Sequence, residues 1–212
     1  MLIVRKIILA LTGLFICLFI TVHLGGNLIL LLPQEHARPL YNAYSSALSG
    51  NLFIKVIAYV NYACFLFHIV YGSIITVKNR RTRKVPYRSN HGGDVTNWSS
   101  QNMGLLGAIL FAFLVIHLIH FWYPVKFSDH EPDLYQLVAE QFRQPFSALF
   151  YTLAMIPLAL HLSHGFSSAF RSLGLYNARY LRWITHLGHA YAMAVSIGFA
   201  LIPIIMYARS VL

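Results

Sequence analysis

The sequence predicts an all-α integral membrane protein, a bundle of five transmembrane helices forming one membrane domain over residues 1–212. Two compositional observations predict this class: 58% of the residues are apolar and only 10% are charged, whereas soluble domains contain about a quarter charged residues. The third observation is that the charged residues leave five long stretches free of Asp, Glu, Lys and Arg. This composition excludes a soluble globular domain and a disordered chain.

Each of the five stretches is long enough to form a helix that crosses a bilayer, which needs about 20 apolar residues. They cover residues 7–32, 56–77, 103–123, 146–170 and 183–207. The uncharged segment 39–54 is shorter and rich in Tyr, Asn and Ser, so we expect an interfacial connection there. The continuous apolar character argues against a transmembrane β-barrel, in which polar and apolar residues alternate.

The distribution of Lys and Arg predicts a cytoplasmic N-terminus and a C-terminus outside, in the cell inner (cytoplasmic) membrane. In that orientation 11 of the 16 basic residues lie on the cytoplasmic side, as the positive-inside rule requires. The net charge of +10 is then mainly a topology signal, and nucleic acid is a poor partner. The basic cluster at 78–88 is interpreted as stop-transfer charge that contacts lipid headgroups, with a docking surface for a cytoplasmic partner as the alternative.

Histidine is the unusual residue of this chain, because eight of its 11 histidines lie within the five stretches. Ionisable side chains are costly inside a membrane and mark functional sites there. Helix depth, counted at 1.5 Å per residue, puts His23 and His117 toward the outer side and His68 and His161 toward the inner side. Two imidazoles from facing helices are the ligand set of a six-coordinate haem iron. The sequence therefore offers two ligand pairs at two depths.

Two other functions remain open at this point. His120, His164 and His189 each follow another histidine by three residues, which raises the possibility of a non-haem metalloenzyme built on histidine clusters. The sequence lacks the H-x-x-x-H box and the intramembrane carboxylates that such sites use. A transporter that couples protons through histidine is the other possibility, although no discontinuous helices or related halves are visible.

Four ordered motifs resemble the cytochrome b subunit of succinate:quinone oxidoreductase in its single-chain, five-helix, two-haem form. They are VHLGGN at 22–27, FHIVYG at 67–72, NWSSQNM at 97–103 leading into IHLIHFW at 116–122, and LHLSHGFSSAF at 160–170 followed by LGL at 173–175. The motifs extend from the first predicted helix to the start of the fifth, so the resemblance covers most of the chain.

The resemblance implies two b haems, with His23 and His117 as axial ligands of the distal haem and His68 and His161 as ligands of the proximal haem. It implies two cytoplasmic partners, a flavoprotein subunit and an iron–sulfur subunit, with the dicarboxylate site and catalysis on the flavoprotein rather than in this chain. This chain is then expected to anchor the complex of succinate dehydrogenase or fumarate reductase, surrounded by membrane lipid, and to exchange electrons with a quinone, menaquinone.

The quinone site implied by the resemblance lies at the outer side, near the distal haem. Glu35, Tyr41 and Asn42 follow the first predicted helix there and are the candidate quinone-binding residues. Tyrosine is also common in the aromatic belt at the membrane interface, so anchoring of this loop is the alternative role of Tyr41.

Overall fold

A computed structural model of the chain describes residues 2–82, 95–127, 133–175 and 177–212. Within these residues it is all-α, as predicted, and it contains five helices that are long and apolar enough to cross a membrane. The protein is therefore a multi-pass helical membrane protein. The predicted basic cluster at 78–88 is described only as far as Thr82, and the rest of it lies outside the described residues.

Each predicted apolar stretch corresponds to one of these five helices. The helices are α1 (Leu2–Asn27), extended by the 3₁₀ turn η1 (Leu28–Leu31); α3 (Leu52–Thr82); α4 (Val95–His117), continued by the π-helical turn η2 (Leu118–Trp122) and α5 (Tyr123–Phe127); α7 (Pro145–Ser172); and α8 (Ala178–Val211). The helices continue beyond most of the charge-free stretches because charged residues are tolerated in the turns that reach the interface.

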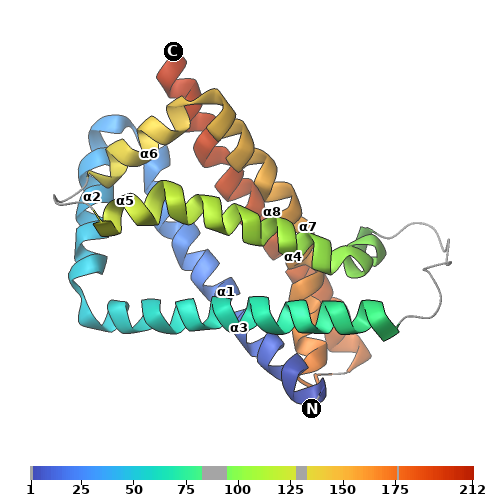
Figure 1. The fold of residues 1–212 in the computed structure, drawn as a ribbon. Coiled ribbons are helices and arrows are strands. Elements are labelled where there is room, and N and C mark those ends of the chain that lie inside the picture. Colours follow the sequence, from blue (N-terminus) through green and yellow to red (C-terminus); the bar gives the residue numbers. More distant parts are fainter. Residues whose placement is uncertain (1, 83–94, 128–132, 176) are drawn as a thin grey trace.

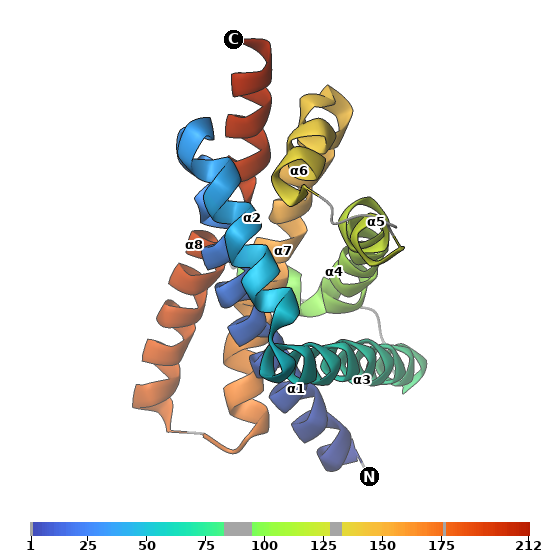
Figure 2. The same ribbon diagram turned by 90° about the vertical axis from the view of Figure 1, so that its left-hand side faces the viewer.

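The two termini lie at opposite ends of the molecule in both views (Figures 1 and 2). An odd number of membrane crossings gives this arrangement. In Figure 1, α1, α7 and α8 run between the two ends, and α3 crosses α1 at a steep angle. The α7–α8 pair has the most extensive contact, and the buried residues Leu162, Ala192 and Val195 lie in its interface.

Two shorter helices, α2 (Gln34–Gly50) and α6 (Leu134–Arg143), lie toward the end of the molecule that holds the C-terminus (Figures 1 and 2). Most of the segment expected to be an interfacial connection therefore forms helix α2. The helix α6 was not anticipated. It buries Tyr135, Val138 and Phe142, whose spacing of three and four residues gives one apolar face.

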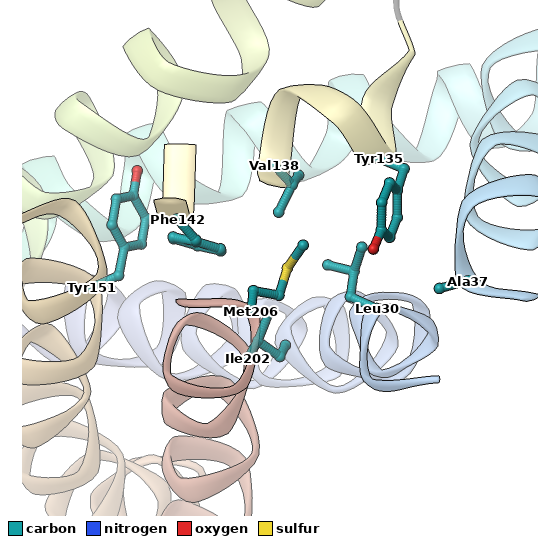
Figure 3. Close-up of a cluster of buried hydrophobic side chains, with 8 residues drawn as sticks. All are labelled: Leu30, Ala37, Tyr135, Val138, Phe142, Tyr151, Ile202 and Met206. Carbon is teal, nitrogen blue, oxygen red and sulfur yellow. The ribbon is translucent and has the colours of Figure 1, made fainter. Parts of the chain in front are cut away.

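We call the apolar cluster at this end the end core (Figure 3). Its eight buried residues come from η1, α2, α6, α7 and α8 and are Leu30, Ala37, Tyr135, Val138, Phe142, Tyr151, Ile202 and Met206. Arg209 of α8 donates hydrogen bonds to the carbonyls of Leu30, Leu31 and Leu32 at 2.6–3.2 Å. These carbonyls end the first long helix and have no helical partner of their own, so the guanidinium both satisfies them and neutralises the helix dipole.

Asp133 joins α2 to α6. Its carboxylate accepts hydrogen bonds from Arg38 Nε and Asn42 Nδ2, each at 2.8 Å, and caps α6 by accepting from the Gln136 amide at 2.9 Å. Partial burial raises the pKa of this carboxyl, but the hydrogen bonds and the Arg38 charge outweigh burial and hold the pKa below its ordinary value of 3.8.

We predict that this carboxylate makes the packing of α2 on α6 sensitive to acid. Because the folded protein lowers its pKa, Asp133 contributes its full stabilisation above pH 3.8 and loses it as the pH falls through the lowered value. Asp133→Asn retains a good helix cap but removes the titration, so its stability in detergent should decline less on acidification. Asp133→Ala should cost about 1–2 kcal/mol at neutral pH through loss of the cap. Equal acid sensitivity of wild type and Asp133→Asn would contradict this assignment.

Candidate functional site

Four of the long helices form a closed ring in which each helix contacts its two neighbours. Helix α1 packs against α3, α3 against α4, α4 against α7, and α7 against α1, whereas α8 packs mainly on α7. The two diagonal pairs, α1 with α4 and α3 with α7, are not among the substantial helix contacts of the described residues. Whatever fills the axis of the ring must therefore come from side chains or from a bound group.

Histidine side chains meet across both diagonals. His23 from α1 faces His117 from α4, with ring centroids 5.9 Å apart and ring planes at 86°. His68 from α3 faces His161 from α7, with centroids 6.3 Å apart and planes at 69°. The structure thus brings the four histidines together in the same two pairs that their depths suggest.

The two histidine pairs lie at different levels of the ring. Helices α1 and α4 give the same distance between these two levels. Gly13 of α1 lies against the His68 ring and Gly107 of α4 lies against the His161 ring. These glycines precede His23 and His117, respectively, by ten residues, which corresponds to about 15 Å along a helix. The hydrocarbon core of a bilayer is about 30 Å thick, so the distance between the two pairs is about half of that thickness.

Aromatic rings surround the His23–His117 pair. Phe19 stacks on His23 with centroids 5.3 Å apart and planes at 12°, and Phe113 stacks on His117 with centroids 5.8 Å apart and planes at 27°. Phe199 of α8 contacts His23 at 5.8 Å. These contacts restrict the orientation of both imidazoles and keep water away from them.

Small residues flank the His68–His161 pair instead. A Cβ atom at position 13 would lie 3.1 Å from Cε1 of His68, and one at position 107 would lie 3.8 Å from Cε1 of His161. Larger side chains at these positions would occupy the space beside the two imidazoles. Both glycines were missed by sequence reasoning because each lies on a different helix from the histidine that it contacts.

Thr12 is a polar neighbour of the His68 ring. The Thr12 hydroxyl donates to the Ile8 carbonyl at 2.8 Å and lies 3.4 Å from Nδ1 of His68. The backbone of Leu9 also hydrogen-bonds to this ring. Hydrogen bonds of this kind orient the ring of a histidine that ligates a metal.

In the opposite member of each pair, the Nδ1 atoms of His117 and His161 are buried and have no hydrogen-bond partner among the described residues. Buried polar atoms are normally satisfied, so the unpartnered nitrogens distinguish these two rings from ordinary packing histidines. Neutral imidazole is the form in which histidine binds metals.

The spacing of the rings fits a metal ion held between them. With a metal–nitrogen bond of about 2 Å and a ring nitrogen about 1.2 Å from its centroid, two imidazoles that share one metal have centroids up to about 6.4 Å apart. The two pairs, at 5.9 and 6.3 Å, lie within this limit. The described residues contain no group of three or more His, Cys, Asp or Glu side chains that could hold a metal. Each pair could supply two ligands to a group that brings its own remaining ligands, as haem does.

The predicted quinone-binding residues lie in different environments. Tyr41 is half-buried and donates a hydrogen bond to Asn27 Oδ1 at 3.1 Å, and the amide of Asn27 donates to the His23 carbonyl at 2.7 Å. Tyr41 is thereby linked to the His23–His117 pair through one side chain. Burial, together with the neighbouring Tyr44, raises the pKa of the Tyr41 phenol to about 12, so the hydroxyl stays protonated.

Asn42 and Glu35 do not join this group. Asn42 donates to Asp133 at 2.8 Å and accepts from the backbone amide of Tyr135 at 3.0 Å, so its amide connects α2 to α6. Glu35 has an exposed side chain whose carboxylate lies 3.9 Å from His36. Of the three candidates, the structure brings only Tyr41 close to the histidine pairs.

A polar pair that sequence reasoning did not assign lies beside His117. His120 Nδ1 and the hydroxyl of the buried Tyr151 are hydrogen-bonded at 3.1 Å, and the Tyr151 ring lies 6.1 Å from that of His117. His120 belongs to the π-helical turn η2. Such turns are rare and cluster at functional sites, but nothing in the residue pattern signals this one.

No family model, curated protein or solved structure matches this chain. Its function is therefore proposed from the motifs and from the geometry of the two histidine pairs.

We predict that Tyr41→Phe destabilises the outer end of the site. The change removes the donor to Asn27 Oδ1 and leaves a half-buried acceptor unsatisfied, which costs about 1–3 kcal/mol. Tyr44→Phe is the matched control, since it makes the same chemical change on the same helix. Thermal unfolding in detergent should show a lower midpoint for Tyr41→Phe than for Tyr44→Phe, and indistinguishable midpoints would contradict the role of the Tyr41 hydroxyl.

Proposed function

We propose that this chain is the dihaem cytochrome b anchor subunit of succinate:quinone oxidoreductase, in a succinate dehydrogenase or fumarate reductase complex. The observation that carries the proposal is the pair of histidine contacts across the two diagonals of the helix ring. In this role the chain passes electrons between a cytoplasmic iron–sulfur subunit and menaquinone in the cell inner membrane. The dicarboxylate reaction belongs to the flavoprotein partner.

His68 and His161 hold the proximal haem in this proposal, and His23 and His117 hold the distal one. When bound, each haem b supplies an iron centre that accepts and releases one electron. The chain supplies the rest: four helices fix the positions of the imidazoles, and the contact of Thr12 with Nδ1 of His68 orients that ring. The aromatic rings around His23 and His117 exclude water, which lowers the local dielectric.

The basic residues support a cytoplasmic location for the partners. Lys78, Arg80 and Arg81 are exposed at the end of α3, on the side that the positive-inside rule assigns to the cytoplasm. In this orientation the His68–His161 pair is the one nearer the partners, and the His23–His117 pair is nearer the outer surface. Electrons entering from the iron–sulfur subunit then reach the two sites in that order.

Tyr41 is the strongest candidate for contact with the quinone at the outer end. Its hydroxyl remains protonated because its pKa is about 12, and it would donate to a quinone oxygen by exchanging its hydrogen bond to Asn27 Oδ1. Its link to His23 through Asn27 puts that contact next to the distal site. Asn42 serves instead to hold α2 against α6, and Glu35 is exposed.

We predict that the four histidines act in two pairs. His68→Ala and His161→Ala should each abolish the same haem, lowering the content from two haems to one per chain, because each change removes one of the two histidines that would hold it. His23→Ala and His117→Ala should each abolish the other haem. Reduced-minus-oxidised spectra of the purified variants distinguish the two components. Loss of one common component in His23→Ala and His68→Ala would show that the pairing is wrong.

A second prediction concerns the space beside the His68 ring. Gly13→Val should lower occupancy of the proximal haem alone, because even a Cβ at position 13 lies 3.1 Å from the His68 ring. Gly25→Val is the matched control on the same helix, since a Cβ there has no neighbour within 4 Å. Haem spectra of both variants check this expectation. Equal haem content in the two variants would contradict the assignment of this space to the cofactor.

A further inference from the structure

A basic pocket lies between α7 and α8 at the end opposite the end core. It has a volume of about 350 Å³ and is lined by Arg171, Leu181, Arg182, Thr185 and His186. Arg171 comes from the last turn of α7, and the other four come from the beginning of α8. Neither the histidine pairs nor the quinone candidates use these residues, so the pocket is separate from the proposed electron path.

The charge of the pocket is not balanced by the described part of the chain. Arg171 donates to Ser167 at 3.2 Å, and neither pocket arginine is among the ion pairs found in the described residues. The described acidic residues, Glu35, Asp133 and Glu140, belong to α2 and α6 near the C-terminal end (Figure 1). The first turn of α8 adds the positive end of its helix dipole. Two guanidinium groups and an imidazole therefore face this pocket without a nearby described carboxylate.

The depth of the pocket is that of the lipid headgroups. The charge-free segments of α7 and α8 end at Phe170 and begin at Trp183, so the pocket lies where both helices leave the hydrocarbon. Tyr180 and Trp183, beside it in the first turns of α8, are 65% and 74% exposed. Exposed Tyr and Trp at helix ends are typical of the membrane interface.

We propose that this pocket binds the phosphate headgroup of an anionic phospholipid. Arg171 and Arg182 are suited to the phosphate oxygens because guanidinium groups bind phosphate with paired hydrogen bonds. His186 adds a further donor, and Leu181 provides apolar contact to the glycerol region. Basic pockets between transmembrane helices on the cytoplasmic side are a recurrent form of lipid site. The proposal is independent of haem binding, because it needs only the ends of α7 and α8.

The test uses the full chain, purified in neutral detergent, with native mass spectrometry to count bound lipid during titration with phosphatidylglycerol or phosphatidylcholine. Wild type should bind phosphatidylglycerol in preference to phosphatidylcholine. Arg171→Gln with Arg182→Gln should weaken the binding of phosphatidylglycerol by about tenfold or more, because two of the charged groups that face the phosphate are lost.

Two further variants separate local from general effects of charge. Arg80→Gln with Arg81→Gln removes the same charge from an exposed site on α3 that lines no part of this pocket, so it should weaken the binding of phosphatidylglycerol much less. Arg182→Lys keeps the charge but loses the paired hydrogen bonds, so its binding should lie between those of wild type and the Arg171→Gln, Arg182→Gln variant. Equal weakening in both double variants, or no weakening in either, would overturn the proposal.

The same samples also test two other possible occupants of the pocket, free phosphate and the carboxylates of a haem. If millimolar inorganic phosphate displaces phosphatidylglycerol as readily as the lipid displaces itself, the pocket is a site for free phosphate and the lipid proposal is wrong. If the Arg171→Gln, Arg182→Gln variant loses haem while it retains lipid, the pocket holds carboxylates of the cofactor and the proposal is again overturned. Selective lipid binding by a preparation without haem would leave this proposal standing and refute the proposed function alone.

Discussion

The constraint on which the rest of the structure depends is the burial of four imidazoles inside a ring of apolar helices. A polar group in a membrane interior needs a partner, and the histidines come from helices that do not otherwise approach one another. Each pair therefore fixes the relative height and rotation of two diagonal helices. A metal-containing planar group between the imidazoles would bind one nitrogen of each ring and fill the space between them, which is why the proposed function rests on these contacts.

The periphery of the molecule keeps this ring in place at one end. Arg209 connects α8 to the end of the first long helix, and Asp133 connects α2 to α6. The apolar residues of the end core lie between these polar contacts and cover the level of His23 and His117. The opposite end carries the pocket lined by Arg171 and Arg182 between α7 and α8.

Much of this arrangement could be predicted from residue pattern alone. Charge-free stretches identify the five long helices because the hydrocarbon excludes charge, and a constant helical rise selects the histidine pairs by depth. Other features depend on contacts between segments that are distant in sequence. Gly13 and Gly107 are ordinary helix residues until the structure puts them against His68 and His161, and Asn42 becomes a structural residue only because Asp133 lies beside it. Helix α6 is short and polar overall, so counting apolar residues does not detect it.

The haem-to-protein ratio of the purified chain tests the central claim most directly. The account predicts two b-type haems for each polypeptide, since the ring contains two histidine pairs at two levels. A chain that is folded in detergent and binds iron or zinc without porphyrin, or binds no metal, would contradict it.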